Sequence, residues 1–453
     1  MYTPLYSALL ELNNKNQLSF HMPGHFDGRA MYGFGNLLEI DTTEVPESDN
    51  LFLPTGPIAE AQAAAARFFG ARETRFLVNG SSGGIMAMVT AVVSEGQKII
   101  CDRFCHRSFI SALITSGAEP VWLYPEIIDD GLMWGGIDPA QLRRTIEGNP
   151  DAAAVYLTSP NYFGLSGDLK KMADIAHEHG LPLLVDAAHG AHYGLSPMLP
   201  PSAIGSGADM AVVSAHKTLP SVTQSSYLHI NGNFPRLDQA LKMYQTSSPS
   251  YILMASLDYA RALMERDGLR LWTKLAENIA EIFPEQLNIP YKHSAHKDPC
   301  RLVLPTTGNP FTAAEILRLE YSISVECCYG GGVVCIANTA HSAEDLLRLR
   351  SALEEVNRRL PHEGKAALAP LKNKAVLTPR QAFFAPCEEI NIKAAVGRVC
   401  AREVVIYPPG VAQLIPGEVI TAEAIEEIIR VTALGGEVHG VKNGKIAVTA
   451  CDQ

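Results

Sequence analysis

Residues 209–226, DMAVVSAHKTLPSVTQSS, place a lysine where a short apolar run gives way to a stretch rich in hydroxyl side chains. The run DMAVVS has the length and composition of a buried β-strand. Lys217 follows it, so such a strand would deliver the lysine to one edge of a sheet. An isolated lysine in this position is most often a solvated surface residue. Its role here depends on what other strands bring to the same edge.

The chain alternates helical and strand patterns between residues 56 and 230. Residues 56–71 have helical spacing and end near Gly70, which is typical of a helix C-cap. Short apolar strands and amphipathic helices then follow one another up to the run at 209–214. This alternation predicts an α/β fold with a mostly parallel sheet covered by helices on both faces. In such sheets, ligands bind beyond the carboxyl ends of the strands.

The chain is long enough for several domains. We predict four segments: an N-terminal arm (1–55), a large domain (56–285), a small α/β lobe (286–365) and a C-terminal domain (366–453). The long helical pattern of residues 251–283 would bridge the large domain and the lobe. A polar break at residues 361–377 precedes the last segment.

Composition narrows the function class. Of 453 residues, 47% are hydrophobic and 19% charged, which is typical of a compact globular protein and disfavours disorder. A net charge of −11 argues against nucleic acid as the main partner. The nine cysteines form no C-x-x-C pair, and no secretory signal or long apolar run is present. We expect a cytoplasmic protein that acts on a small molecule, away from membranes.

Four segments are predicted to meet at one edge of the sheet. NGSSGG (79–84) offers backbone N–H groups and the hydroxyls of Ser81 and Ser82 at the start of a helix, a suitable place for a phosphate. His106 follows the strand KIIC, and Asp186 ends the strand LPLLVD. Lys217 completes the set. Each feature alone is weak, since Gly-Ser turns, capping aspartates and surface histidines are common.

Pyridoxal 5'-phosphate (PLP) requires all four features together. A lysine condenses with its aldehyde as a Schiff base, and an aspartate keeps its pyridine nitrogen protonated. A histidine can stack on the ring, and the glycine-rich helix start can hold the phosphate. His189 and His192 have the spacing of metal ligands, but no third ligand is indicated nearby. We therefore predict a PLP site and no metal.

These segments also resemble the ornithine/lysine/arginine decarboxylase family of bacteria, whose members have the aspartate-aminotransferase-like PLP fold. The resemblance covers most of the chain. It is carried by FHMPGH (20–25), residues 41–62, FLVNGSSGG (76–84), DRFCHRS (102–108), SPNYFG (159–164), LLVDAAHGAH (183–192), SAHKTLPSVTQSS (214–226), TSSPSYILMASLD (246–258), GRVCAREVVIYPPGV (397–411) and PGEVIT (416–421).

The resemblance implies a role for each site residue. Lys217 matches the Schiff-base lysine, Asp186 the pyridine partner, and His106 the stacked histidine that could return a proton to Cα. The residues implied around the phosphate and the ring are Ser81, Ser82, Ser214, His216 and His189. Ser247 and Ser248 resemble a segment that reaches the neighbouring subunit's cofactor, which implies a homodimer. The implied reaction removes the α-carboxyl group of a basic amino acid in polyamine metabolism.

Several positions depart from the family pattern. Phe26 stands where a lysine is usual, Asn50 where a second aspartate is common, and Arg402 and Ile406 alter the C-terminal motif. The flavodoxin-like N-terminal extension of larger members is not expected here. This compact form favours arginine as substrate, with lysine and ornithine left open.

A basic substrate needs a carboxylate at the far end of the pocket. Glu44 and Asp49 are our candidates, with an exposed loop or a helix cap as the alternative, and Glu403 and Glu418 compete for the role. Two other functions remain open. One is a different PLP reaction, such as transamination or lyase chemistry, and the other is a paralogue that binds PLP without turnover.

Overall fold

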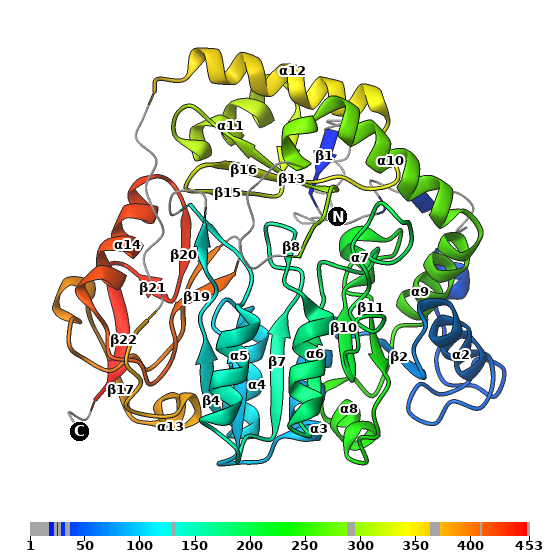
Figure 1. Ribbon diagram of the computed structural model, residues 1–453, viewed down its shortest axis with the longest axis horizontal. Coiled ribbons are helices and arrows are strands. Elements are labelled where there is room, and N and C mark those ends of the chain that lie inside the picture. Colours follow the sequence, from blue (N-terminus) through cyan, green and yellow to red (C-terminus); the bar gives the residue numbers. More distant parts are fainter. Residues whose placement is uncertain are drawn as a thin grey trace, which may run out of the picture.

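The computed structural model describes residues 18–21, 25, 29–31, 37–128, 132–287, 295–362, 372–407 and 410–450. Its centre is a seven-stranded sheet in the lower half of Figure 1. The strands lie in the order β2 (Glu73–Leu77), β11 (Ser226–Ile230), β10 (Met210–Val213), β9 (Leu183–Asp186), β7 (Ala154–Thr158), β3 (Lys98–Asp102) and β4 (Glu119–Leu123). Every strand runs the same way except β11, which is antiparallel to both neighbours. The predicted α/β fold with a mostly parallel sheet is confirmed.

Both faces of the sheet are buried, as its continuous apolar strands require. Successive residues alternate between two cores, so Leu183 and Val185 pack on one side and Leu184 on the other. One core includes α3 (Gly80–Val92), α4 (Arg107–Ser116) and α8 (Leu237–Tyr244). The opposite core includes α2 (Pro57–Phe69), α5 (Pro139–Glu147), α6 (Leu169–Glu178) and α9 (Tyr251–Leu263).

A long helical segment connects the sheet to a smaller lobe at the top of Figure 1. It consists of α9, a π-helical turn (Met264–Gly268) and α10 (Leu269–Ile282), as the sequence pattern predicts. The lobe contains the sheet β13 (Arg301–Pro305), β16 (Gly332–Ile336) and β15 (Cys327–Tyr329), with helices α11 (Pro310–Glu320) and α12 (Ala343–Arg359). The N-terminal strand β1 (Leu18–Phe20) pairs in parallel with β14 (Ile323–Val325) of this lobe.

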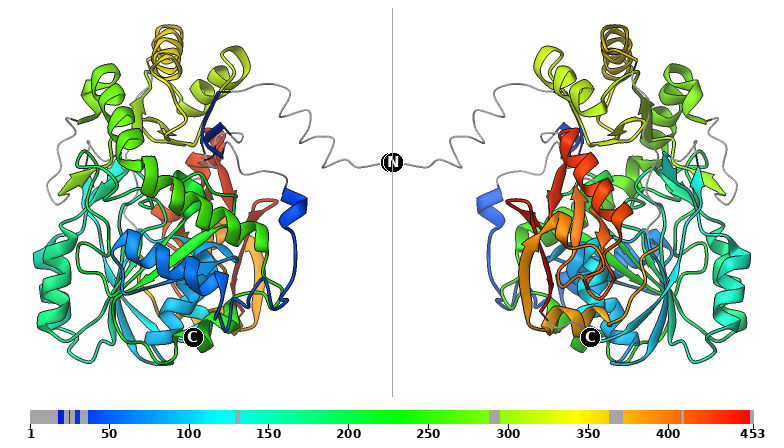
Figure 2. Two further views of the ribbon diagram at one scale, coloured as in Figure 1. Left: turned by 90° about the vertical axis from the view of Figure 1, so that its right-hand side faces the viewer. Right: turned by 90° about the vertical axis from the view of Figure 1, so that its left-hand side faces the viewer.

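The last part of the chain lies beside the large sheet in Figure 1, and it faces the viewer in the right-hand view of Figure 2. Its elements are α13 (Pro379–Phe384), β17 (Cys387–Asn391), β18 (Val404–Tyr407), β19 (Val411–Leu414), α14 (Ala422–Ala433), β20 (Glu437–His439), β21 (Val441–Lys442) and β22 (Lys445–Thr449). Val405 and Ala412 from β18 and β19 join the core around α4. This region therefore lies against the element that follows His106.

Two pairs of short strands lie outside the larger sheets. They are β5 (Ile127–Ile128) with β6 (Met133–Trp134), and β8 (Leu165–Ser166) with β12 (His296–Lys297). The hydroxyl-rich stretch after β10 begins with the short helix α7 (Ala215–Thr218). None of the helices in the described ranges is long and apolar enough to cross a membrane.

Candidate active site

A single pocket collects the side chains that the sequence analysis placed at one edge of the sheet. Ser81, His106, Asp186, His189 and Lys217 all line it. They follow β2, β3, β9 and β10, whose carboxyl ends share that edge. The remaining lining residues are Ile85, Phe104, Thr158, Tyr162, Ala188 and Val411.

Lys217 lies in α7, directly after β10. Its Nζ is 2.8 Å from Nε2 of His189. Burial lowers the pKa of Lys217 to about 8, although the carboxylates of Asp186 and Glu326 oppose the shift. A lysine with this pKa spends part of its time at neutral pH as a free amine, the nucleophilic form.

Asp186 is the last residue of β9 and is almost fully buried. One carboxylate oxygen accepts from the backbone N–H of Ala188 at 3.0 Å, and the other is 3.4 Å from the hydroxyl of Tyr156. Burial raises the pKa of Asp186, while the Ala188 N–H and the Lys217 charge lower it. A cationic group placed in the pocket would stabilise its ionised form.

His106 is the N-cap of α4, and its Nδ1 accepts from the backbone N–H of Ser108 at 3.2 Å. This bond fixes the orientation of the ring. Burial lowers its pKa to about 3, with further lowering by Lys217 and Arg107, so the ring is neutral at physiological pH. Its backbone forms an isolated β-bridge with Val411 of β19, which lines the same pocket.

The first turn of α3 forms a cradle beside these groups. Gly80 has a φ of +69°, which only glycine adopts readily, and a Cβ on Gly84 would lie 2.4 Å from the Leu77 side chain. The hydroxyl of Ser214 donates to that of Ser81 at 2.8 Å. Nδ1 of His216 lies 2.9 Å from the carbonyl oxygen of Ser225, while Ser82 is exposed.

Comparison with known proteins identifies the family. Residues 3–305 match the model of the "Orn/Lys/Arg decarboxylase, major domain", and residues 364–439 match that of the family's C-terminal domain. The chain belongs to the Orn/Lys/Arg decarboxylase family. The resemblance noted from the sequence is thereby confirmed, and the protein is an amino acid decarboxylase of that family, a family of PLP-dependent enzymes.

Several related proteins align with nearly the whole chain of the decarboxylase. An arginine decarboxylase of Bacillus subtilis (strain 168) is 35% identical over 98% of this chain and 96% of its own. An arginine decarboxylase of Bacillus anthracis is 34% identical over 97% and 94%. The constitutive lysine decarboxylase of Escherichia coli (strain K12) is 25% identical over 98% and 80%.

Solved structures agree on the fold. The structure of the Escherichia coli constitutive lysine decarboxylase superposes with a TM-score of 0.79 at 21% identity, covering 99% of this chain and 82% of that one. An alanine–glyoxylate aminotransferase from Nostoc sp. superposes with a TM-score of 0.53 at 16% identity, covering 66% and 86%. These likenesses establish the architecture common to fold-type-I PLP enzymes.

Asp49, a candidate for substrate binding, uses its carboxylate to bind backbone N–H groups of its own chain. Both oxygens accept hydrogen bonds from backbone N–H groups at and before the start of α2. This is the helix-capping contact that the sequence left as the alternative. Glu44 is half-buried, and its carboxylate accepts from the Thr43 hydroxyl at 2.8 Å.

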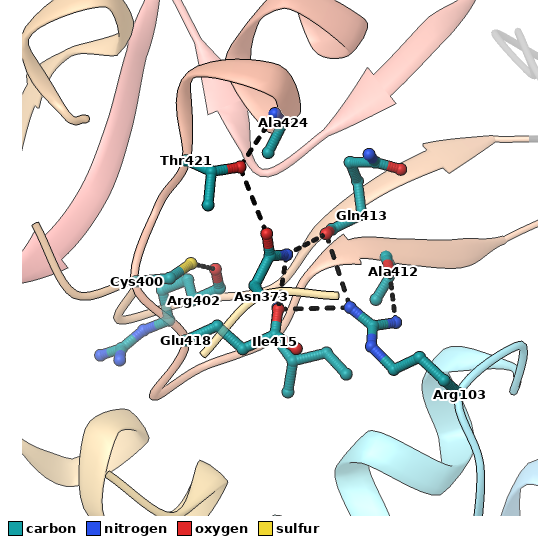
Figure 3. Close-up of polar contacts among 10 residues, drawn as sticks. All are labelled: Arg103, Asn373, Cys400, Arg402, Ala412, Gln413, Ile415, Glu418, Thr421 and Ala424. Atoms are coloured by element: carbon teal, nitrogen blue, oxygen red, sulfur yellow. Dashed lines mark hydrogen bonds and ion pairs between the residues drawn. The ribbon is translucent and has the colours of Figure 1, made fainter. Parts of the chain in front are cut away.

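Glu403 and Glu418, the competing carboxylates, pair with arginines on either side of His106. Glu403 is 2.5 Å from Arg107, and Glu418 is 3.2 Å from Arg103. Figure 3 shows the second pair at the centre of a network that joins the His106 loop to the C-terminal region. Arg103 also donates to the Ala412 carbonyl at 2.8 Å, and Glu418 accepts from Asn373 at 3.1 Å.

The burial of this pair makes it a structural clamp. The Arg103 and Glu418 side chains are 0% and 2% exposed. A charge in such an environment is tolerated only when it is paired and hydrogen-bonded. The clamp and the His106–Val411 bridge therefore hold β19 against the pocket in the decarboxylase.

Three residues near Lys217 were not predicted from the sequence: Arg301, Tyr162 and Glu326. Arg301, at the start of β13, donates to Nδ1 of His189 at 2.7 Å. The Tyr162 hydroxyl donates to Glu326 at 2.5 Å, and the Arg301 guanidinium lies over the Tyr162 ring. Tyr162 falls within the family-like SPNYFG segment, which could have drawn attention to it. Arg301 and Glu326 come from the lobe and carry no local signal.

Ser247 and Ser248 follow α8 and are exposed, outside the pocket lining. Whether they reach a second subunit stays a prediction. Of the departures from the family pattern, Phe26 lies outside the described residues. Asn50 accepts from the Phe52 backbone N–H at 2.8 Å, and Arg402 packs over the Phe383 ring in the C-terminal region.

His192 lies close to two possible metal ligands, Asp298 and Cys300, that its sequence context did not indicate. Its ring lies within metal-ligand reach of Asp298 and Cys300, and all three are buried. Nε2 is 3.1 Å from the Asp298 carboxylate, and the ring stacks on Trp272. Burial raises the pKa of the Cys300 thiol well above its usual range. The His192–Asp298 pair joins the large domain to the lobe.

Proposed function

We propose that this decarboxylase removes the α-carboxyl group of arginine with PLP as cofactor, yielding the corresponding amine. The observation that carries the proposal is the pocket in which Lys217, Asp186, His106 and Ser81 meet. The two relatives named arginine decarboxylase, at 34–35% identity over nearly the full chain, support arginine.

The residues present fit the cofactor. The Thr158 hydroxyl lines the pocket and is buried, with no partner among the described residues, so the site has a donor to spare for a ligand. Lys217 would hold the aldehyde, Asp186 the pyridine nitrogen, and the start of α3 with Ser214 and His216 the phosphate. When bound, PLP supplies an electron sink for the bond to the departing carboxyl group.

The chain's own groups divide the remaining work. Neutral His106, whose Nδ1 accepts from the Ser108 backbone N–H, carries its ring proton on Nε2, the atom from which a proton could be returned to the substrate carbon. Ile85, Phe104 and Val411 give the pocket an apolar wall that excludes water from the reacting carbon. Asp186 remains buried, so its interaction with a cationic ring nitrogen would be poorly screened.

Recognition of the basic end of the substrate calls for a carboxylate, and Glu326 is the one we propose. Its charge reaches Lys217 from the lobe side, where it raises the pKa of that lysine. Asp49, Glu403 and Glu418 bind groups outside the pocket lining, whereas Glu326 accepts from the hydroxyl of Tyr162, a pocket residue. E326Q should raise the KM for arginine by about tenfold with a smaller effect on kcat. E320Q, an exposed carboxylate on α11, is the control. An unchanged KM in E326Q would remove Glu326 from this role.

The direct test measures carbon dioxide release from purified, PLP-loaded protein given arginine, lysine and ornithine separately. We expect release from arginine above the other two. A keto acid or aldehyde without carbon dioxide would mean a different PLP reaction, and a cofactor spectrum without any product would mean a binding protein. K217A should lose the visible band of bound cofactor, whereas K242A, at an exposed position on α8, should keep it.

The subunit arrangement completes the proposal. We propose a homodimer in which Ser247 and Ser248 reach the cofactor of the neighbouring chain. Their exposure in the single chain, beyond the end of α8, is compatible with such a contact. Hybrid dimers of two inactive variants test this arrangement.

A further inference from the structure

Arg301 lies behind the pocket, and its contacts are those of a residue that acts through another. It is 1% exposed and opens β13 of the lobe. Gly164, with a φ of +75°, gives it room, because a Cβ there would lie 2.5 Å from Cβ of Arg301. Its guanidinium donates to Nδ1 of His189 at 2.7 Å, and Nε2 of that ring is 2.8 Å from Nζ of Lys217.

The hydrogen-bond donors and acceptors of Arg301, His189 and Lys217 determine which nitrogen atoms carry the protons. A guanidinium is always charged and has only donors, so Nδ1 of His189 must be the acceptor. The proton of the neutral ring is then on Nε2 and points at Nζ of Lys217. Two donors cannot share one hydrogen bond, so Nζ must accept, and only the neutral amine has a lone pair to do so.

We propose that Arg301 is a positioning residue, which fixes His189 in the Nε2–H tautomer and thereby holds Lys217 as a neutral amine. This inference rests on the proposed function, because it concerns Lys217 as the cofactor-binding residue. It explains why a fully charged arginine is buried beside the nucleophile. The neutral amine is the form that can attack an aldehyde.

The pKa shifts of His189 and Lys217 agree with this assignment of the protons. Burial lowers the pKa of His189 well below its usual range, and both Lys217 and Arg301 lower it further. Arg301 also lowers the pKa of Lys217. The charged or titratable groups that act on Lys217 or respond to it are Asp186, Glu326, Arg301, His106, His189 and His216. Of these, Arg301 is the cation whose charge cannot be switched off by pH.

The first test reads the tautomer directly in cofactor-free protein. Nitrogen NMR of protein with ¹⁵N-labelled histidine distinguishes Nδ1–H from Nε2–H, and H189Q identifies the His189 signals by their loss. We expect Nε2–H in the wild type, retention in R301K, and a mixture of tautomers in R301M. R261M, which removes an α9 arginine that pairs with Asp258 and with Glu265 of the π-helical turn, should leave the signals unchanged. An Nδ1–H signal in the wild type would overturn the inference without any variant.

The second test follows the pH titration of the visible band of PLP-loaded protein. Removing a cation and a hydrogen-bond donor should raise the midpoint in R301M by about one pH unit. In an H189Q background, the same substitution should produce a clearly smaller shift. Equal shifts in both backgrounds, or no shift in a folded R301M, would contradict a role through His189. Protein that binds no PLP would refute the proposed function, while the NMR result would still decide the tautomer.

Discussion

Asp49 illustrates how one residue can stabilise the entry to the large domain. It has a φ of 70°, in the left-handed region, and its carboxylate accepts hydrogen bonds from five backbone N–H groups. Burial alone would raise its pKa, but the N–H groups of Thr55, Asn50, Gly56 and Ala59 outweigh it and lower the pKa to about 2. Two of these bonds come from the α2 residues Ile58 and Ala59, so the carboxylate also faces the positive end of the helix dipole.

D49N tests this capping role against the substrate role considered from the sequence. Asparagine tolerates the left-handed conformation, so the substitution isolates the charge and the second acceptor. The folded-state pKa of about 2 lies below the usual 3.8, so the stabilisation is complete above about pH 4 and is lost as the pH falls towards 2. We expect D49N to lose about 2 kcal/mol at pH 7 and to show a flatter acid limb in denaturant unfolding. A raised KM for arginine with unchanged stability would instead support substrate binding.

The residues at the ends of strands could be predicted, whereas those from the lobe could not. Lys217, Asp186 and His106 each follow a short apolar run, and the carboxyl ends of parallel strands share an edge. Arg301 and Glu326 reach the same place only through the packing of the lobe on the large domain. Nothing in their local sequence distinguishes them from surface charges.

Among the helices and strands, too, those with a local sequence pattern could be predicted, whereas β11 and α7 depend on the packing around them. The strands on either side of the pocket are continuous apolar runs bounded by turn signals, so they were predictable. The direction of β11 (Ser226–Ile230) could not be predicted, because it is set by antiparallel pairing with both β10 and β2 and not by the strand's own sequence pattern. The four residues of α7 are too few to produce a helical periodicity.

The clamp between Arg103 and Glu418 gives a prediction for the element β19. E418Q leaves the buried Arg103 charge without its counterion, which costs about 3–5 kcal/mol. We expect a lower unfolding midpoint together with weaker PLP binding, because Val411 and the His106 loop lose a common support. Equilibrium unfolding and cofactor titration measure the two effects.

The control for the clamp is E388Q, which breaks the half-exposed ion pair between Glu388 and Arg398 on the far side of the same region. Such a pair contributes at most about 1 kcal/mol. If E418Q were as mild as E388Q, the clamp would not support the pocket.

At the scale of the whole molecule, the proposed dimer can be tested by complementation. K217A removes the anchoring lysine of one chain, and a double substitution S247D/S248D would repel the phosphate of the neighbouring chain's cofactor. A hybrid dimer of the two variants has one intact pocket if these serines act across the interface. Mixed and re-associated in equal amounts, the inactive variants should recover about one quarter of wild-type activity.

The alternative arrangements give different results in the same experiment. If the serines act within their own chain, each pocket of the hybrid keeps one defect and no activity returns. If they have no role at the cofactor, S247D/S248D is active by itself.

The clamp also has a consequence for protein synthesis. Arg103 and Glu418 are 315 positions apart, so a ribosome adding about 5–20 residues per second needs on the order of 15–60 s to pass from one to the other. Throughout that interval, the emerging chain carries an arginine destined for a fully buried position and no carboxylate to receive it. The part of the pocket wall that Val411 supplies is therefore synthesised long after Lys217, Asp186 and His106. A chain terminated between Lys217 and Val411 would retain the catalytic side chains yet lack the part of the apolar wall that Val411 provides.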